Sequence, residues 1–246
     1  MSDLPQKDPW ARLRAATPAR IGLGRSGAGL QTGTNLAFQF AHARARDAVH
    51  RAVDPVALAQ ELAPHPVIQL TSAAPDRATY LRRPDLGRML SADSQDKLRG
   101  YEKPDVVFVI ADGLSADAVQ AHAVPVVRAS VRAMPKIQIG PIVIATQARV
   151  AIGDQIGAAL DARLSILLVG ERPGLTVADS LGAYLTYAPM PGRKDSDRNC
   201  LSNIHGQGGL SYGEAAHKIA WLTREALKLG LTGTGLKEEA GPALPA

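Results

Sequence analysis

The stretch PDVVFVIADGLSADAV, residues 104–119, decides the fold class of this chain. Its first part, VVFVI over 106–110, is a continuous apolar run rich in β-branched side chains, which is typical of a strand buried on both faces of a sheet. The polar turn that follows leads into a helix, and Ser115 is its expected N-cap, because a serine hydroxyl can accept a hydrogen bond from a free helical N–H. A buried strand followed by a helix is the unit from which parallel sheets are built.

The same alternation continues along the chain. Further apolar runs predict strands over 67–72, 137–145, 164–169 and 183–189, and amphipathic patterns predict helices over 149–160 and 213–230. Gly230 suits the end of the last helix. We therefore predict an α/β fold: a Rossmann-like, mostly parallel sheet with helices on both faces, since right-handed crossovers place helices there.

A helical region precedes this sheet. The stretch LAFQFAHARARDAVHRAV (36–53) places apolar side chains at helical spacing, with Asn35 or Thr34 as its expected N-cap. A further short helix is expected over 55–63, where Pro64 would end it.

These patterns divide the chain into three parts. We predict a helical N-terminal region over 1–65, a Rossmann-like domain over 66–230 and a flexible tail over 231–246.

Composition limits the classes of function. The chain has 246 residues and a formal net charge of +5, and its first 100 residues hold 14 basic and 9 acidic side chains, so the excess lies there. Since no aromatic side chains are interleaved to stack on bases, a solvated face or a protein partner is favoured over nucleic acid. The single cysteine, Cys200, excludes an intrachain disulfide. With no apolar run of membrane-spanning length and no secretory signal pattern, we expect a soluble cytoplasmic protein without a membrane partner.

One glycine pattern suggests a nucleotide. GLGRSG, residues 22–27, has the G-x-G-x-x-G spacing of dinucleotide-binding loops. Such a loop needs a buried strand before it and an acidic side chain about 20 residues later. Here the preceding segment is charged and helical, and Asp47, near the right distance, falls within a predicted helix. A free-standing NAD(P)-dependent oxidoreductase is therefore the weaker alternative.

Ligand-binding positions are expected where loops follow the parallel strands, because ligands of open α/β sheets bind outside the carboxyl ends of strands. Asp112, Val150 and Glu171 occupy such loops, and the polar, glycine-rich segment 197–209 is a further candidate loop. Each has an ordinary structural interpretation: Asp112 as a turn residue, Val150 as core, and Glu171 as the surface partner of Arg172.

No catalytic motif is present. Cys200 has no base placed near it in sequence, and no Cys/His spacing resembles a zinc site. We therefore predict a binding domain with neither catalytic nor metal-ligating residues of its own.

Several segments together resemble the small (light) subunit of ethanolamine ammonia-lyase. The resemblance covers roughly residues 8–230 and rests on these motifs: PARIGLGRSGAGLQT (18–32), YLRRPDLGRML (80–90), PDVVFVIADGLSADAV (104–119), DQIG (154–157), LLVGERPGL (167–175) and DRNCLSNIHGQGG (197–209). The combination of LLVGERPGL with C-x-S-N-I-H is the most specific of these matches.

The resemblance implies a function. Enzymes of this family use adenosylcobalamin to convert ethanolamine to acetaldehyde and ammonia by a radical mechanism. The large subunit is a TIM-type barrel that binds ethanolamine, and the small subunit covers the cobalamin at the interface between the two in a hetero-oligomer. The family's cofactor-binding positions match Val150, Glu171 and Cys200 in this sequence. An apolar Val150 suits the corrin, Glu171 can accept hydrogen bonds from its amides, and Cys200 is small enough for close approach.

Three further expectations concern the cofactor, the location and the partner. Many cobalamin proteins carry an Asp-x-His-x-x-Gly loop whose histidine replaces the benzimidazole under cobalt, and this sequence lacks it, so we predict base-on binding. The protein is expected either free in the cytoplasm or inside a bacterial microcompartment, and the sequence does not distinguish the two. The Arg82, Arg83 and Arg88 side chains are candidates for contact with the large subunit.

Overall fold

A six-stranded sheet forms the centre of the molecule. The computed structural model describes residues 8–17, 19–25, 27–101 and 103–241. The strands are β1 (Val67–Thr71), β2 (Val106–Ala111), β3 (Ile142–Thr146), β4 (Leu164–Gly170), β5 (Leu181–Tyr187) and β6 (Arg198–Ile204), in the order β1-β3-β2-β4-β5-β6. The first four strands in this order are parallel, whereas β5 and β6 are antiparallel additions. The predicted α/β class with a mostly parallel sheet is confirmed.

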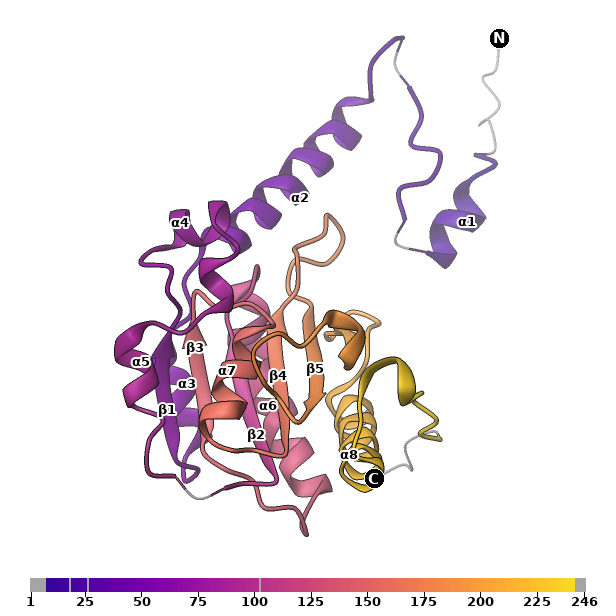
Figure 1. Cartoon of the computed structure of the whole chain (residues 1–246). Helices are drawn as coiled ribbons and strands as arrows, with labels where there is room; N and C mark the ends of the chain where they lie inside the picture. Colours follow the sequence, from indigo (N-terminus) through magenta and orange to yellow (C-terminus); the bar gives the residue numbers. More distant parts are fainter. Residues whose placement is uncertain (1–7, 18, 26, 102, 242–246) are drawn as a thin grey trace, which may run out of the picture.

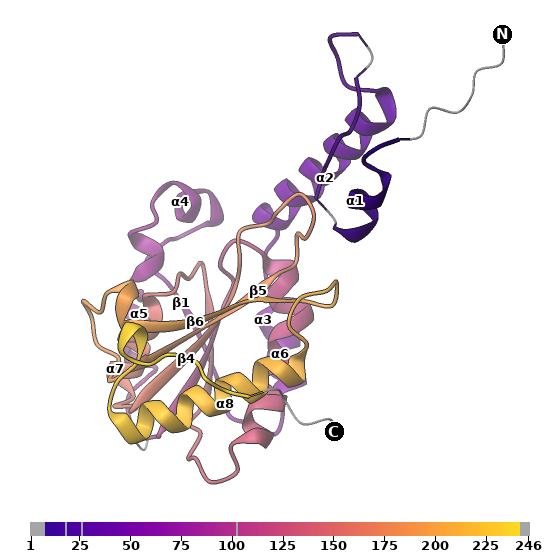
Figure 2. The ribbon, with the colours of Figure 1, turned by 90° about the vertical axis from the view of Figure 1, so that its right-hand side faces the viewer.

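Helices cover the sheet on both faces (Figures 1 and 2). In the described residues they are α1 (Ala11–Ala16), α2 (Thr32–His50), α3 (Pro55–Leu62), α4 (Arg77–Arg82), α5 (Ala92–Asp96), α6 (Ala116–Ala133), α7 (Ile152–Ala159) and α8 (Tyr212–Leu229), with short 3-10 turns at Leu86–Arg88, Asp195–Asp197 and Gly233–Gly235. Within this described part of the chain, no helix has both the length and the apolar character that a membrane crossing requires.

The strand order creates a topological switch point at β2. The chain moves from β2 back to β3 through α6, and then from β3 past β2 to β4 through α7. Because the two crossovers run in opposite directions, their helices lie on opposite faces of the sheet. The loops after β2 and β3 therefore diverge at the carboxyl edge, where open α/β sheets bind their ligands.

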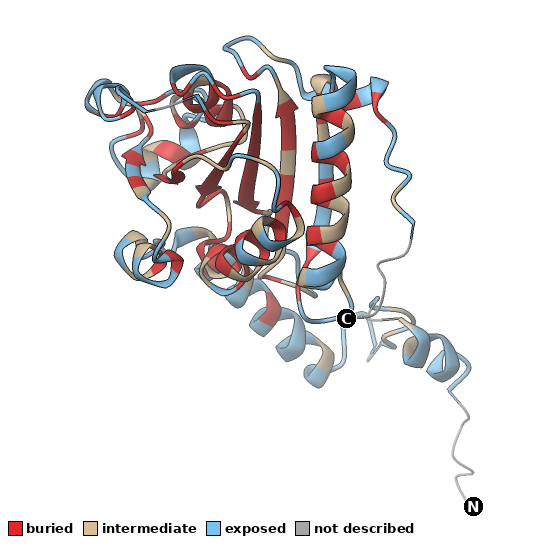
Figure 3. Ribbon diagram, turned by 90° about the horizontal axis from the view of Figure 1, so that it is seen from below, coloured by how far each residue is buried: buried red, intermediate tan, exposed pale blue. Residues whose placement is uncertain are grey.

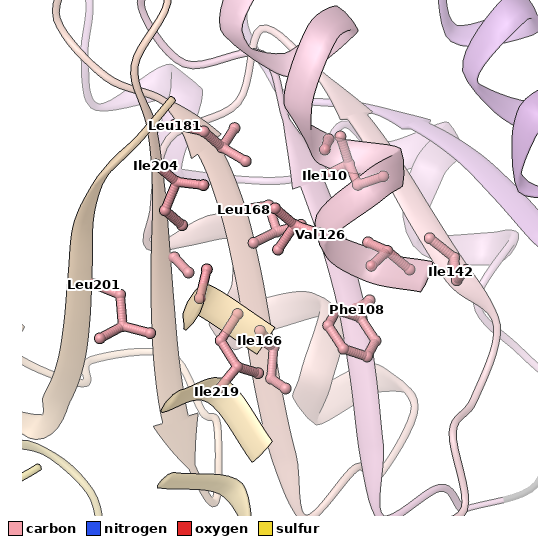
Figure 4. Packing of buried hydrophobic residues seen from close by; sticks show 14 of the residues in the cluster. Phe108, Ile110, Val126, Ile142, Ile166, Leu168, Leu181, Leu201, Ile204 and Ile219 are labelled. Carbon is pink, nitrogen blue, oxygen red and sulfur yellow. The ribbon is translucent and has the colours of Figure 1, made fainter. Parts of the chain in front are cut away.

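One face of the sheet buries the larger core. Phe108, Ile110, Ile166 and Leu168 point from β2 and β4 toward α6 and α8 (Figure 4). The four inner strands β3, β2, β4 and β5 are buried along most of their length, whereas the edge strands β1 and β6 are partly exposed (Figure 3). Helix α3 also contributes to this core, since its Leu58 and Leu62 are fully buried there. Thus α3, which the sequence assigned to the N-terminal region, packs with the sheet.

The opposite face is covered only in part. There α7 packs on β4 and β2 through Ile152 and Ile156. Beyond it, the outer strand β6 alternates between buried Leu201, which faces the α8 side, and exposed Cys200 and Ser202. The part of this face formed by β5 and β6 therefore stays accessible beside α7.

Local signals in the sequence mark several helix ends correctly. Ser115 caps α6, accepting a hydrogen bond from Ala118 N at 3.2 Å, and Gly230 ends α8 in the left-handed region at φ 72°. The expected caps of α2 are wrong. That helix begins at Thr32, and Asn35 N donates to Gln31 O at 3.0 Å, so Asn35 already lies inside the first turn.

Two predictions for strands and loops also need correction. The strand expected over 137–145 begins only at Ile142, because Pro141 has no N–H to donate to a ladder. The segment 197–209, expected as a loop, contains β6, since its backbone pairs with β5.

The segment after α8 is not free over its described part. A flexible tail was expected over 231–246, yet the Asn199 side chain accepts from Gly233 N at 2.8 Å and donates to Leu236 O at 2.7 Å. Leu236 is buried. Residues 233–236 therefore pack beside β6, Glu238 pairs with Lys218 of α8, and 242–246 lie outside the described residues.

The N-terminal helices stand away from the sheet (Figures 1 and 2). Only Ala41 and Ala48 of α2 are buried, and α1 buries none of its residues. Leu36 and Phe40, which belong to the apolar helical pattern of residues 36–53, are 59% and 66% exposed. We call residues 8–51 the N-terminal arm.

A buried ion pair joins α7 to β6. Arg198 donates from Nη1 to Asp154 Oδ1 at 2.6 Å and from Nη2 to Asp154 Oδ2 at 2.7 Å, and it also reaches Thr186 Oγ1 at 2.9 Å. Both charged side chains are almost fully buried. Each charge therefore depends on the other for its solvation.

We predict that Asp154→Ala lowers the free energy of unfolding by about 3–5 kcal/mol, because it leaves the Arg198 guanidinium buried without its counter-charge. Urea denaturation followed by circular dichroism measures the change. Asp96→Ala, which removes an exposed ion pair with Arg99, is the matched control and should leave stability nearly unchanged. Equal effects of the two substitutions would contradict the structural importance of the buried pair.

Candidate functional site

The structure brings the three predicted site residues to the same region. Val150 and Glu171 follow β3 and β4 and line one cavity of about 310 Å³ at the carboxyl edge. Tyr184 of β5 lines the same cavity, and Cys200 is its cross-strand partner on β6. Strand pairing thus places Cys200 next to a cavity residue, although it is far from the other two in sequence.

Glu171 is held by hydrogen bonds from the β5–β6 side of the site. Its Oε2 accepts from the Ser180 hydroxyl and from Asn203 N at 3.3 Å, and its Oε1 accepts from the Ser202 hydroxyl at 2.5 Å. Because a carboxylate offers about four lone-pair sites, one acceptor position of Oε1 is left for a ligand. Hydroxyls and a backbone amide, rather than Arg172, are therefore its hydrogen-bond partners.

The backbone conformation of β5 and β6 around Gly182 and Asn203 accommodates the Glu171 side chain. Asn203 has φ 60°, in the left-handed region, and lies where the β5–β6 register shifts. A side chain on Gly182 would bring its Cβ to 3.0 Å from Glu171 Oε1. The irregularity aims Asn203 N at the carboxylate.

Cys200 presents a neutral thiol. The residue is exposed, but neighbouring atoms shield its sulfur from water, which raises the pKa of the thiol above its ordinary value. The Glu171 carboxylate raises that pKa further, whereas a hydrogen bond from Tyr184 acts in the opposite direction. Burial likewise raises the pKa of Tyr184, so its phenol remains neutral. The pair therefore offers a small, uncharged surface.

Asp112 has a structural role at the base of the site. Its carboxylate is buried and accepts from Gln147 N at 2.9 Å, Ala148 N at 2.8 Å and Arg77 Nη1 at 3.1 Å. Burial raises the pKa of Asp112, and these donors oppose the shift. Asp112 thereby fixes the start of the loop that carries Val150.

Sequence reasoning missed Tyr80, which supports the cavity from below. Its hydroxyl donates to Gly113 O at 2.8 Å, and the guanidinium groups of Arg77 and Arg149 each lie 4.8 Å from its ring centroid. Burial raises the pKa of Tyr80. A signal for Tyr184 was available, because alternate residues of a strand share one face, but no local pattern marks Tyr80.

The glycine pattern noted in the sequence lies away from this cavity. The glycines Gly22, Gly24 and Gly27 lie between α1 and α2, and the described residues before them contain no strand of the sheet. The NAD(P)-dependent oxidoreductase alternative is therefore not supported. Among the described residues, no group of three His, Cys, Asp or Glu side chains is arranged to hold a metal ion.

The candidate arginines differ in their surroundings. Arg83 pairs with Asp85 at 2.7 Å, and Arg82 donates to Ala78 O within α4. Arg88 lines a second cavity beside Val150.

Comparisons with known proteins agree on one family. The sequence model of the family described as ethanolamine ammonia-lyase light chain (EutC) matches residues 7–237 of this chain. The chain is 51% identical to the ethanolamine ammonia-lyase small subunit of Xanthomonas campestris over 96% of its own length and 90% of that protein. The identity is 49% for the small subunit of Azotobacter vinelandii, over 95% and 90% of the two chains, and 52% for that of Bradyrhizobium diazoefficiens, over 96% and 93%.

We predict that Cys200 is alkylated by iodoacetamide with a midpoint in pH above that of the same chain unfolded in urea, because the thiolate is the reactive form and the folded protein disfavours it. Tyr184→Phe should shift the midpoint further upward by removing a hydrogen bond to the thiolate. The protein's single cysteine lets mass spectrometry report the site directly. A folded midpoint at or below the unfolded one would refute the assigned environment.

Proposed function

Because the chain belongs to the ethanolamine ammonia-lyase light-chain family, we propose that it binds adenosylcobalamin at the carboxyl edge of its sheet and forms the active enzyme only with a large subunit. The observation that carries this proposal is the convergence of Val150, Glu171 and Cys200 around Tyr184. When bound, the cofactor supplies the radical that starts the conversion of ethanolamine to acetaldehyde and ammonia.

The residues at the site fit the chemistry of a cobalamin. A corrin has a broad apolar face and a rim of amide groups. Val150, partly exposed, offers an apolar contact, and the free acceptor position of Glu171 suits an amide N–H. The exposed β5–β6 surface with the neutral Cys200 thiol allows a large, flat molecule to approach closely. This chain therefore binds and orients the cofactor.

The catalytic step belongs to the partner in this proposal. Ethanolamine is bound by the large subunit, a TIM-type barrel, and no residue of this chain is assigned a catalytic or metal-ligating role. The site lies on an open surface, so the large subunit also excludes water from the bound cofactor. The setting is the cytoplasm, with enclosure in a bacterial microcompartment as the alternative.

The N-terminal arm supplies a surface for that partner. It exposes Leu36, Phe38 and Phe40, and its 7 Arg and 2 Asp give a net charge of +5, equal to that of the whole chain. Leu36 and Phe40, four residues apart, share one face of α2, and exposed apolar side chains grouped in this way commonly mark protein interfaces. We propose that this arm contacts an acidic surface of the large subunit.

The arm and the cavity lie at the same edge of the sheet. Arg77, which holds Asp112, also donates from Nε to Val49 O near the end of α2, at 2.7 Å. Arg20 reaches Leu175 O, in the loop that begins with Glu171, at 3.3 Å. One partner could therefore hold the arm and cover the cofactor together.

We predict that the chain releases ammonia from ethanolamine only when it is co-purified with its large subunit and supplied with adenosylcobalamin. In that complex, Val150→Asp should weaken cobalamin binding at least tenfold, because it places a charge against an apolar ligand surface. Absorption titration gives the Kd. Arg224→Gln, exposed on α8, is the control expected to bind like the wild type. Full activity of the isolated chain, or unchanged binding by Val150→Asp, would overturn the proposal.

We further predict base-on binding, in which the cofactor keeps its own benzimidazole under cobalt. None of the residues that line the two cavities around Val150 is a histidine. Electron paramagnetic resonance of the cob(II)alamin state should show the same nitrogen coupling whether the protein histidines carry ¹⁴N or ¹⁵N. A coupling that changes with ¹⁵N-histidine would show that a protein imidazole is the ligand, contrary to this prediction.

A further inference from the structure

We propose that the second cavity beside Val150 is an anion subsite that binds a phosphate ester group. Its volume is about 350 Å³, and five basic side chains line it: Arg88, Arg149, Arg193, Lys194 and Arg198. The only acidic side chain in its lining is Asp195, which is 99% exposed. Neither the family resemblance nor the three cofactor positions above assign a function to these charges.

Most of these charges lack a counter-charge in the described structure. Arg198 is neutralised by Asp154, as described above. No acidic side chain of the described residues lies within ion-pair distance of Arg88, Arg149, Arg193 or Lys194. Like charges gathered around one cavity repel each other, and a bound anion offsets that cost.

A buried donor in the cavity wall is also unpartnered. The Arg149 guanidinium lies over the Tyr80 ring, and its Nε is buried without a hydrogen-bond partner. A buried N–H that makes no hydrogen bond is costly, and a shift of the Arg149 side chain toward a bound acceptor would remove this penalty. Arginine suits oxyanions because its planar fork can donate to two oxygens.

The N-terminus of α7 contributes further positive potential. This eight-residue helix begins directly after Ala151, and no side chain caps it. The first N–H groups of the helix, those of residues 152–154, already donate to backbone carbonyls, so the helix contributes its dipole and not free donors. Val150 and Ala151 line the cavity, so the positive end of this dipole lies beside it. The basic side chains and the helix dipole therefore favour an anionic ligand.

The anion subsite adjoins the apolar cavity. The two cavities share Arg149, Val150 and Tyr184. A single ligand with an apolar body and an anionic arm can therefore occupy both. This step rests on the proposed function: cobalamin has an apolar corrin and a nucleotide tail with one phosphodiester, and that phosphodiester is the anion we assign to the subsite.

The test compares ligands with and without the phosphodiester in the complex with the large subunit. The variant is Arg88→Gln/Lys194→Gln, which removes two exposed charges that make no ion pair and leaves the buried Arg198 intact. Arg224→Gln/Lys228→Gln on α8 removes the same charge from the helix on the opposite face. Gel filtration checks that every complex still assembles.

We expect the Arg88/Lys194 variant to bind cobalamin roughly tenfold more weakly, and to bind cobinamide, which lacks the nucleotide tail, within about twofold of the wild type. The α8 variant should match the wild type with both ligands. Added salt should weaken cobalamin binding more in the wild type than in the Arg88/Lys194 variant, because fewer charges remain to be screened.

Titration with inorganic phosphate and with ADP separates the possible sources of the anion. If cobalamin binding is insensitive to the Arg88/Lys194 substitutions but ADP or phosphate binding is lost, the subsite stands and its ligand is a free phosphate compound. If no ligand responds to these substitutions, or if cobalamin and cobinamide weaken equally, the anion subsite is wrong. If the wild-type complex binds neither corrinoid, the proposed function fails, and the phosphate titration still decides the subsite.

Discussion

The buried carboxylate of Asp112 is the constraint on which the carboxyl edge of this protein depends. It accepts hydrogen bonds from the loop after β3 while it is itself part of the loop after β2, and Arg77 completes its set of donors. A buried charge of this kind is tolerated only when its partners are fixed, so the three segments hold one relative position. Gly113 must be glycine at φ 56°, because a Cβ there would overlap the carbonyl oxygen of Gly170. The loops that carry Val150 and Glu171 are thereby held against each other before any ligand binds.

The antiparallel strands β5 and β6 determine the other half of the site. A sheet that ended at β4 would offer only a narrow crevice between loops. The two added strands extend one face beyond the reach of α7, and period-two alternation directs Tyr184, Cys200 and Ser202 to that face while Leu201 stays in the core. The same extension supplies Ser202 and Asn203 as donors to Glu171. The site thus joins two kinds of geometry: loops at a switch point and an open strand surface.

Local sequence signals and long-range contacts explain which features could be predicted. The strands β2 and β4 follow from continuous apolar runs, and Ser115 and Gly230 mark helix ends through their own backbone preferences. Strand β6 was missed because its polar sequence becomes a strand only by pairing with β5. The packing of Leu236 depends on Asn199, 37 residues earlier in the chain. The rule that ligands bind after parallel strands placed Val150 and Glu171 among several loop candidates, but only the family resemblance selected these two together with Cys200. Tyr80 and the basic cavity appear only once the loops are assembled.

The division of the molecule into a rigid site and an extended arm follows from what each part buries. The sheet domain satisfies its own apolar surface, whereas α2 buries two alanines and leaves Leu36, Phe38 and Phe40 in water. A helix of 19 residues gains little stability without packing, and the contact we propose with the large subunit would bury these side chains. The radical reaction of the proposed function requires that water and oxidants be kept from its intermediates, and an open surface on one chain cannot do this alone. Under that proposal the exposed arm and the open site have the same explanation: a second chain that binds the first also encloses the cofactor.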